Sequence, residues 1–476
     1  MLSHRTGLPR HDFVWVDNQF NYSWILERLP HLELSADIRQ SLQYCNLTFI
    51  AASVIIEELT GISFSDFISR RIFRPLGMKN SNFSVDEMWK TQDFAKPYKI
   101  DFRVEKFRLI ECEYVVNDSL IGAGGINSSV FDVGKWLRFH LNNGKVGNKQ
   151  LVSPGNLRMT YAQGLSAMYC NESIQGILRK YYPDQKWFRN ETWALGWMNQ
   201  MYRGYNLIAH PGGLDGSTAL MTFLPDEDIG VFAITNQSDC YLPFAVAYHL
   251  VDDTLEMNPV DWALIFQRIE NQMNKVLKET EKHSKELRKA DALPTHDLQE
   301  YSGKYQHPGY GPLEFYIEKG LPMMKYGTVN YPLSHYHYDT FQFEMTRWDI
   351  RELLTFQVDS LGDIIGVSVK IEELLPPILF KKLPEDYLRE KKFLQTLVGK
   401  YDLAGQIVEI RLKGNDAIMF APLEQPPVEL EPVRGLRYKS KDSDLINLLF
   451  KRDENDKVTE FMFVAHRQVV SAKKIS

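Results

Sequence analysis

An internal repeat constrains the C-terminal half of this chain more than any other feature of its sequence. The segment Leu298-Gln-Glu-Tyr-Ser-Gly-Lys-Tyr305 returns 96 residues later as Leu394-Gln-Thr-Leu-Val-Gly-Lys-Tyr401. A second pair, Leu353 to Asp359 and Leu448 to Asp453, is similar in style, and a turn and another strand-like run follow each member. Short β-branched and aromatic runs between turn residues are typical of strands. The sequence therefore predicts two copies of one small β module.

The length of the chain predicts several domains. Its 476 residues exceed what one hydrophobic core usually supports. We expect an N-terminal domain over residues 1–255, a helical linker over 256–294, and the two β modules over 295–385 and 390–476. The linker is expected from a long, charge-laced helical pattern that ends at Leu293-Pro294.

Four segments of the N-terminal domain have the apolar spacing and the end signals of helices. Apolar residues recur at helical spacing after Asn46, from Leu47 to Leu59, and Gly61 suits a C-terminal cap. Three further helices are expected: one from Phe64 to Phe73, stopped by Pro75 and Gly77; one with Ser128 or Ser129 as its N-cap, ending at Asn143-Gly144; and one from Phe244 to Leu255.

Strand patterns replace the helical ones between Trp193 and Asn236. Short apolar runs are broken by the turn signals Tyr202-Arg-Gly204, Pro211-Gly-Gly213 and Pro225-Asp-Glu-Asp228. We expect three or four strands in an antiparallel meander, with His210 at the point where a strand runs into a tight turn.

Charge and cysteine content exclude several classes of protein. The net charge of -6, with scattered Lys and Arg, disfavours nucleic acid and anionic membrane as partners. The four cysteines form no CxxC pair and suggest neither a zinc site nor a disulfide framework. No run of eighteen apolar residues and no signal-peptide pattern occurs, so the chain is expected to be soluble, in a compartment left open.

Two short motifs have the residue types of an active site. Tyr44-Cys45-Asn46 directly precedes a predicted helix, and His210-Pro211-Gly212-Gly213 ends a predicted strand. A tyrosine beside cations can act as a general base, and an amide side chain can bind a substrate carbonyl. Taken singly, Tyr44 and Asn46 are more often a packing residue and a helix cap, and the His210 motif is more often only a turn.

The segment Ser334-His-Tyr-His-Tyr-Asp339 raises the question of a metal site. His335, His337 and Asp339 would lie on one face of a strand. A packed strand of a small barrel explains the same pattern better, because no fourth ligand is evident. We therefore expect no metal and no cofactor.

The order of motifs resembles that of the serine β-lactamase-like family, which includes class C β-lactamases, penicillin-binding proteins, related esterases and D-aminopeptidases. The opening Leu2-Ser-His-Arg-Thr-Gly-Leu-Pro9 is similar to the family's "LLSHTSGLP" segment, and Tyr44-Cys45-Asn46 to its Tyr-x-Asn motif. The remaining resemblances, in chain order, are Ile72 to Met78 with "IFEPLGM", Ala123 to Ser128 with "AGGLxS", Ala194 to Trp197 with "YGLGW", His210-Pro211-Gly212 with the His-x-Gly variant of Lys-Thr-Gly, and Gly230 to Asn236 with the closing strand.

This resemblance implies an α+β fold, in which helices flank an antiparallel sheet, followed by two all-β barrel-like domains as in D-aminopeptidases. It implies Tyr44 as general base or proton shuttle, Asn46 as a substrate contact and His210 as electrophilic and proton-relay partner. It also implies that the backbone at Gly212 and Gly213 binds the substrate, with the Gly213 N–H as one oxyanion donor.

The family's nucleophile is the serine of a Ser-x-x-Lys motif that precedes the "LSHTSGLP" segment. The only Ser-x-x-Lys here is Ser471-Ala-Lys-Lys474, in the C-terminal tail, which we assign to chance. We therefore expect a β-lactamase-related hydrolase that is N-terminally incomplete and inactive as written, with an open core face and an unpaired sheet edge.

A complete protein would transfer an acyl group from a D-amino-acid peptide, peptidoglycan fragment, β-lactam or ester. The alternative is a non-catalytic binding or interaction protein derived from that family. Whether this chain is an enzyme, and its oligomeric state, stay open.

Overall fold

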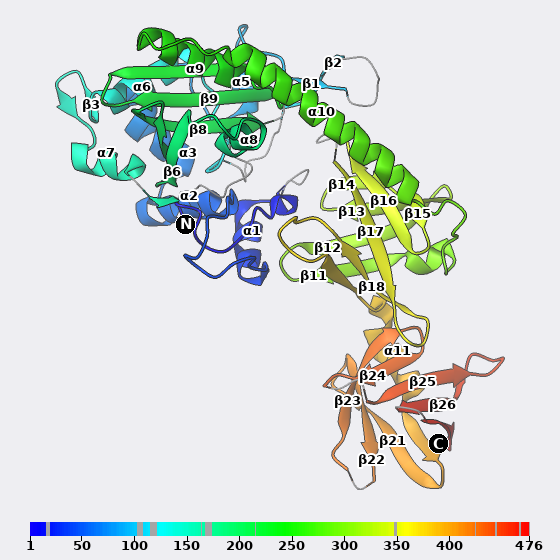
Figure 1. The fold of residues 1–476 in the computed structure, drawn as a ribbon. Coiled ribbons are helices and arrows are strands. Elements are labelled where there is room, and N and C mark those ends of the chain that lie inside the picture. The colour runs from blue at the N-terminus through cyan, green and yellow to red at the C-terminus, as the bar shows by residue number, and fades with distance from the viewer. Residues whose placement is uncertain are drawn as a thin grey trace.

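The computed structural model describes residues 1–476 except 16–19, 102–107, 115–120, 163, 167–173, 215, 347–349, 424, 443–444, 466–467 and 476. Figure 1 shows the N-terminal domain connected by one long helix, α10 (Trp262–Leu287), to a first β module, with a second β module at the far end of the molecule. The N-terminal domain has the α+β arrangement expected from the sequence, with helices on both sides of an antiparallel sheet.

The central sheet has the strand order β10-β9-β8-β7-β6-β5, and every neighbouring pair is antiparallel. Its strands are β5 (Leu165–Ser166), β6 (Phe188–Trp193), β7 (Met198–Tyr202), β8 (Tyr205–Leu214), β9 (Ser217–Leu224) and β10 (Ile229–Thr235). The expected meander is confirmed, but β8 does not turn at Pro211. It continues as a strand to Leu214, because Pro211 and the two glycines after it still pair with β9.

Helices cover the two faces of this sheet. Helix α9 (Leu242–Thr254) and α10 pack on the face that carries Leu207, Leu220 and Leu224. Helix α6 (Val130–Leu141) packs on the opposite face, where a Cβ at Gly230 would lie 3.3 Å from Leu137.

Several helix ends predicted from the sequence agree with the structure. Helix α2 (Leu47–Thr60) ends at Gly61 in the left-handed conformation (φ 69°), and Ser129 caps α6 by accepting a hydrogen bond from the Asp132 N–H. The predicted helix from Phe64 instead consists of α3 (Phe64–Ile68), a π-helical segment (Ser69–Phe73) and α4 (Arg74–Leu76). The helical run continues through Pro75 and ends at Leu76, with Gly77 in the left-handed conformation (φ 69°) as its C-cap.

The remaining elements of the N-terminal domain are short. They are the 3₁₀ turns Asp12–Val14 and Leu29–His31, and α1 (Tyr22–Arg28), α5 (Val85–Trp89), β1 (Tyr98–Ile100), β2 (Leu109–Glu111), β3 (Lys145–Val146), β4 (Lys149–Gln150), α7 (Pro154–Tyr161) and α8 (Ile174–Tyr181).

The first β module is a nine-stranded, nearly closed antiparallel sheet in the order β14-β13-β12-β11-β19-β18-β17-β16-β15. A 3₁₀ turn (Leu298–Tyr301) precedes it. Its strands are β11 (Gly303–His307), β12 (Gly311–Glu318), β13 (Leu321–Tyr326), β14 (Val329–Pro332), β15 (Ser334–His337), β16 (Thr340–Met345), β17 (Ile350–Val358), β18 (Ile364–Val369) and β19 (Ile378–Lys382).

The second β module is a closed barrel of eight consecutive strands with a filled interior. A 3₁₀ turn (Asp386–Arg389) and α11 (Lys391–Leu397) lead into it. Its strands are β20 (Gly399–Leu403), β21 (Gln406–Lys413), β22 (Ala417–Pro422), β23 (Val428–Arg434), β24 (Arg437–Ser440), β25 (Asn447–Arg452), β26 (Val458–Ala465) and β27 (Gln468–Lys474).

The repeated sequence forms the same local structure in both modules. The Tyr305 hydroxyl donates to the carbonyl of Tyr301 (2.9 Å), and the Tyr401 hydroxyl donates to the carbonyl of Leu397 (2.7 Å). Lys382 lies over the Tyr305 ring at 5.5 Å and Lys474 over the Tyr401 ring at 5.6 Å. Each tyrosine therefore joins the first strand of its module to the last strand and to the helical segment before it, which is a 3₁₀ turn in the first module and α11 in the second.

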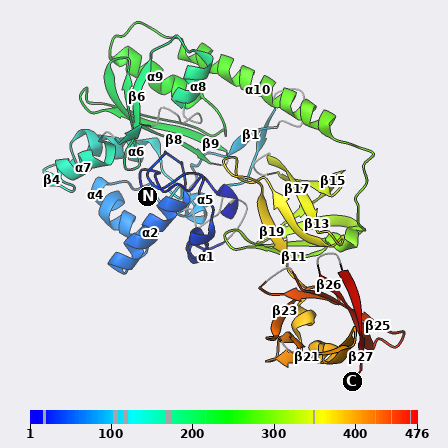
Figure 2. The ribbon, with the colours of Figure 1, turned by 60° about the horizontal axis from the view of Figure 1, so that its bottom comes forward.

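The first β module shares its hydrophobic core with the start of the chain. Phe13 stacks on Tyr326 with ring centroids 4.5 Å apart, and one continuous cluster of buried residues includes Trp15, Ile25 and Leu47 together with the module's interior. Figure 2 shows the blue N-terminal segment beside the yellow-green strands of this module.

An ionic network joins the two β modules. Arg437 contacts Asp359 (2.7 Å) and Asp363 (2.6 Å), and Arg434 contacts Glu300 (2.8 Å). All five side chains are at most about one third exposed, so solvent screens these pairs less than it would screen surface pairs.

No single helix in the described ranges is long and apolar enough to cross a membrane. The bent pair of Leu47–Thr60 and Phe64–Leu76 passes that test by length and composition alone. Cys45, Cys112 and Cys240 are free of disulfides, and Cys170 lies outside the described residues.

Candidate active site

Tyr44 is positioned by the first residues of the chain. The buried His4 ring accepts a hydrogen bond from the Cys45 N–H at Nδ1 (3.1 Å) and lies 4.4 Å from the Tyr44 ring. The backbone of the opening segment bonds the residues before Tyr44, since the Gln43 N–H donates to the His4 carbonyl. The motif around His4 therefore holds the loop that presents Tyr44 and Asn46.

Trp193, at the end of β6, joins the two motifs predicted from the sequence. Its ring centroid lies 5.6 Å from Tyr44 and 5.5 Å from His210, edge-on in both cases. It also lies 5.0 Å from His4. The structure thus brings Tyr44 and His210, which are 166 positions apart in the sequence, onto the two sides of one indole.

His210 is held as a neutral imidazole. Its Nδ1 lies 2.5 Å from the carbonyl oxygen of Pro211, so Nδ1 carries the proton and Nε2 is left as the acceptor. Burial lowers the pKa of His210, which favours this neutral form. At this position the ring can accept a proton at Nε2.

Tyr44 is held as a neutral phenol. Burial raises its pKa, and the nearby Arg10 guanidinium opposes that rise. Arg10 lies over the Tyr44 ring at 5.2 Å and is oriented by Asp12, whose other oxygen accepts from the Trp15 indole N–H (2.9 Å). The cation expected beside this tyrosine is therefore Arg10.

The backbone at Gly213 can donate to an oxyanion. Hydrogen-bonded pairs alternate along an antiparallel ladder, so the N–H of Gly213 points the same way as those of Leu207 and Ala209, toward β7. Strand β7 starts at Met198, which pairs with Ala209, so Gly213 lies past its end. By the same alternation the N–H of Gly212 points to β9, so only Gly213 presents its N–H to this site.

Asn46 occupies the N-cap position of α2 without acting as a cap. Its carbonyl accepts from the N–H groups of Phe49 and Ile50, but its side chain makes no capping hydrogen bond. The capping explanation is therefore wrong, and the amide lies at the wall of the cleft.

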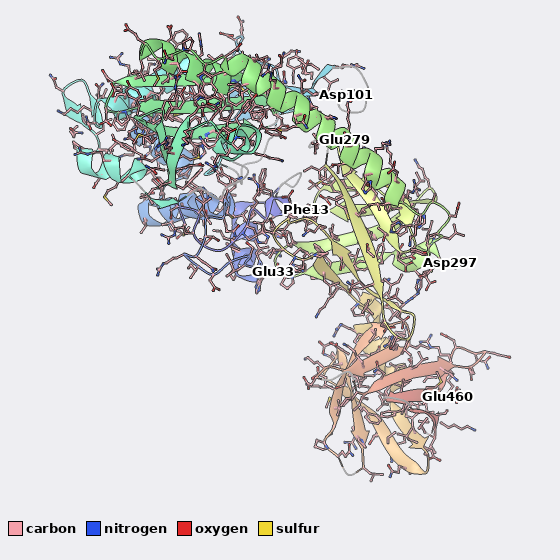
Figure 3. The ribbon with its side chains drawn as sticks, viewed as in Figure 1. Phe13, Glu33, Asp101, Glu279, Asp297 and Glu460 are labelled. Atoms are coloured by element: carbon pink, nitrogen blue, oxygen red, sulfur yellow. The ribbon has the colours of Figure 1, made fainter. Side chains whose placement is uncertain are left out.

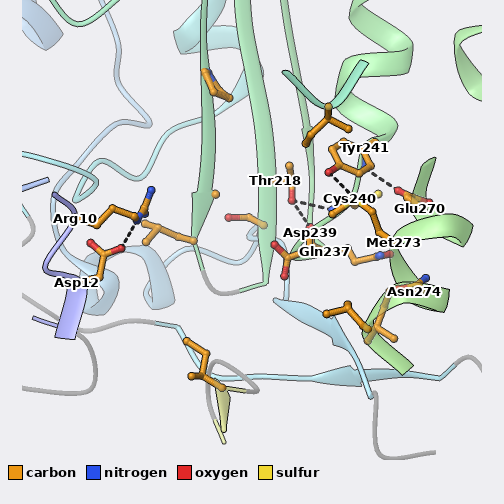
Figure 4. A pocket seen from close by; sticks show the side chains of 18 of the residues that line it. Arg10, Asp12, Thr218, Gln237, Asp239, Cys240, Tyr241, Glu270, Met273 and Asn274 are labelled. Atoms are coloured by element: carbon orange, nitrogen blue, oxygen red, sulfur yellow. Dashed lines mark hydrogen bonds and ion pairs between the residues drawn. The ribbon is translucent and has the colours of Figure 1, made fainter. Parts of the chain in front are cut away.

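These residues line one large cleft of about 2510 Å³ between the N-terminal domain, α10 and the first β module. Figure 4 shows Arg10 and Asp12 on one side of it and Thr218, Asp239, Glu270 and Asn274 on the other. Tyr44, Asn46, His210, Gly212 and Gly213 all belong to its lining. The cleft is well above the usual size of a small-molecule pocket, about 300–1,000 Å³.

Part of this cleft is an uncovered sheet face. Ala219, Met221, Phe232 and Ile234 line it, and register places all four on the same face as His210 and Gly212. Strand β10 is the outer strand of the described sheet, and Ile234 is 50% exposed. An apolar face and a free strand edge therefore flank the candidate catalytic groups.

The described cleft contains no Ser-x-x-Lys pair. Ser471 lies on β27 of the second barrel and donates to Glu460, away from the residues that line the cleft. The predicted histidine segment reaches the cleft with Ser334 and His335, but His335 contacts the Tyr338 carbonyl, and Asp339 accepts from Thr295 and Tyr301. No group of metal-ligating side chains is found among the described residues.

Three residues that contact the predicted site residues are absent from the sequence-based prediction: His4, Arg10 and Trp193. His4 belongs to the opening motif and Trp193 directly precedes the Ala194 to Trp197 motif, so both had a local signal. Arg10 has none, because only folding places it over Tyr44.

A family model described as "Beta-lactamase" matches residues 1–256, and a "Domain of unknown function (DUF3471)" matches residues 287–382. The chain is 28% identical over 321 residues to the unguisins hydrolase ungD' of Aspergillus campestris, covering 65% of this chain and 56% of that protein. It is 29% identical over 152 residues to penicillin-binding protein 4* of Bacillus subtilis, covering 28% of this chain and 33% of that protein.

Solved structures with a similar arrangement include a penicillin-binding protein homologue from Pyrococcus abyssi, with a TM-score of 0.46, 18% identity, and coverage of 80% of this chain and 77% of that one. The D-amino acid amidase from Ochrobactrum anthropi SV3 has a TM-score of 0.40 and 20% sequence identity, with coverage of 54% of this chain and 68% of that one. The chain spans just over half the length of the unguisins hydrolases that it matches, 56% and 58%.

Proposed function

Because this chain belongs to the beta-lactamase family over residues 1–256, we propose that the protein is a serine hydrolase that transfers an acyl group from an amide or ester. The observation that carries the proposal is the grouping of Tyr44 and His210 on Trp193, in a cleft that Asn46 and Gly213 also line. These are the residues at the positions of the family's motifs, and folding brings them together.

Each residue has a role in that chemistry. A serine Oγ would attack the substrate carbonyl carbon, and its proton would pass to the leaving nitrogen or oxygen through the neutral Tyr44 hydroxyl and His210 Nε2. The Gly213 N–H would stabilise the oxyanion, and the Asn46 amide would hold a substrate carbonyl. Water would then release the acyl group from the serine.

Residues 1–476 place no Ser-x-x-Lys pair at the cleft to supply the nucleophile of this reaction. We therefore expect these residues alone to form no acyl-enzyme. The uncovered face of Ala219, Met221, Phe232 and Ile234 is where a helix with that pair would pack. A substrate peptide fits the size of the cleft, and a curated relative is named as a hydrolase of unguisins.

Labelling with a fluorophosphonate, followed by peptide mapping, tests this function. Residues 1–476 should remain unlabelled and should not hydrolyse a chromogenic ester. A protein extended in frame by a helix with a Ser-x-x-Lys motif should be labelled at the serine of that motif. Substituting that serine by Ala should abolish labelling, and Tyr44→Phe should slow it by about 10²-fold or more. An unreactive extended chain would instead favour a non-catalytic binding protein, and labelling of residues 1–476 would place the nucleophile elsewhere.

A further inference from the structure

The first β module forms one wall of the cleft that holds the candidate catalytic residues. Gln342, Glu344, Arg351, Glu352 and Lys370 line the same cleft as Tyr44 and His210. They come from β16, from β17 and from the residue that follows β18. The matching family description assigns this module no function.

This wall is fixed relative to Tyr44 by buried contacts. The Tyr310 hydroxyl lies 2.7 Å from His11 Nδ1, and the His11 N–H donates to Glu372 (2.8 Å). His307 Nε2 lies 3.0 Å from Glu33 Oε1. Figure 3 shows Phe13 and Glu33 on the side of the N-terminal domain that faces this module. The segment that begins with Arg10 is thus bonded directly to the module.

Glu352 is the unusual residue of this wall. On β17 it shares the inward face with Leu354 and Phe356 and lies opposite Phe343, but it is at the end of the strand that opens onto the cleft. It is half-buried, and no hydrogen bond or ion pair of its carboxylate is found in the described part of the chain.

The charged neighbours of Glu352 are engaged elsewhere or repel it. Lys370 donates to the carbonyls of Glu373 and Leu375, and Arg351 Nε lies 3.5 Å from Glu344 Oε2. Burial, followed by the charge of Glu373, raises the pKa of Glu352 to about 7, and Lys370 opposes the rise. A cation that binds beside Glu352 would relieve the cost of burying this carboxylate.

We propose that the first β module is a substrate-binding wall, and that Glu352 binds a cationic group of the substrate, namely the free amino terminus of a peptide. This rests on the proposed hydrolase function and extends it to substrate selection. An ammonium group bonded to a half-buried carboxylate contributes about 1.5–3 kcal/mol to binding, which corresponds to at least tenfold in affinity.

Binding of matched peptides to the full 476-residue chain tests this role without requiring a nucleophile. The probes are the dipeptide amides D-Phe-D-Phe-NH₂ and L-Phe-L-Phe-NH₂, each with a free or an acetylated amino terminus, titrated by calorimetry where light scattering shows a monomer. We expect one free-amine form to bind at least tenfold more tightly than its acetylated counterpart at pH 7.5, where the amino terminus, with its usual pKa of about 7.7–8.0, and the Glu352 carboxylate are both mostly charged. The preference should shrink below pH 7, as Glu352 becomes protonated.

Glu352→Gln should remove the preference, while Glu314→Gln, at an exposed position of β12 outside the cleft lining, should retain it. Equal thermal melting of both variants shows that folding is unchanged, and Glu352→Asp provides a second variant if the first does not fold. Equal affinity for free and acetylated forms, no binding of any probe at millimolar concentration, or a preference that persists in Glu352→Gln would each overturn the proposal. Failure of the labelling experiment above would leave these outcomes readable, since binding precedes acyl transfer.

Discussion

Histidine burial makes the N-terminal domain sensitive to acid at the scale of single residues. His140 is 2% exposed, has no hydrogen-bond partner on either nitrogen among the residues that the structure describes, and contacts the rings of Trp136, Trp197 and Phe223. Burial lowers its pKa to about 4, and burial likewise lowers the pKa of His4 to about 3, with the proximity of His210 as the second cause. Protonating either ring would place an unpaired charge in an apolar interior.

His140→Leu should therefore flatten the dependence of stability on pH. An unfolded histidine binds a proton near pH 6.5 and the folded one does not, so the free energy of unfolding falls as pH drops below 6.5. For His140 this loss is about 2 kcal/mol between pH 7 and pH 5. Urea unfolding at both pH values should show the loss reduced by about this amount in the variant.

The matched control is His249→Leu, at an exposed position of α9, which should keep the pH slope of the unchanged protein. Equal slopes for His140→Leu and the unchanged protein would contradict the prediction.

The repeat gives a second prediction at the residue scale. Tyr305→Phe and Tyr401→Phe each leave a carbonyl without its donor, so each should lower the free energy of unfolding by about 1–2 kcal/mol. Urea unfolding measures both, and Tyr387→Phe, at a 46% exposed position, is the control with a change near zero. Unequal losses of stability in the two variants would mean that this hydrogen bond does not contribute equally to the two β modules.

At the scale of elements, β10 should drive self-association. Its outer edge is unpaired in the described sheet, and Ile234 is 50% exposed on the apolar face of the cleft. Ile234→Lys should reduce association and the binding of a hydrophobic dye, since a charge on an edge strand opposes pairing with another chain. Sedimentation velocity measures the association, and Leu250→Lys, on α9 at 45% exposure, is the control that should leave it unchanged.

Helix α2 illustrates what local patterns reveal about an element. Its start and its Gly61 cap are predicted from the sequence, but its buried face is not. Ile55 and Leu59 are exposed, while Thr48 and Ser53 are buried. Polar residues can take those buried positions because each hydroxyl donates to a carbonyl three residues earlier, which satisfies it within the helix.

Local sequence patterns are also insufficient to predict which residues meet at the candidate active site. Motif order predicts that Tyr44 and His210 belong together, and their joint contact with Trp193 agrees with it. No periodicity in the sequence indicates that Glu352 lines the cleft with them, because that depends on how two separately patterned segments dock.

For the whole molecule, the network around Arg437 should set the angle between the β modules. Arg437→Gln removes both contacts to Asp359 and Asp363, so small-angle scattering should show a larger radius of gyration and proteolysis should cleave faster near residues 383–390. Arg411→Gln, which breaks a pair within β21 alone, should change neither measurement. An unchanged Arg437→Gln protein would show that apolar contacts suffice.

The core that the first β module shares with Phe13 and Trp15 bears on how the protein is made. These residues leave the ribosome about 300 residues before their partners in β12 to β16, a delay of roughly 15 to 60 seconds at typical synthesis rates. During that interval Phe13 and Trp15 lack the part of their core that the first β module supplies, and their rings are accessible to chaperones or to other nascent chains. Folding of the N-terminal domain is therefore expected to finish only after the first β module has been synthesised.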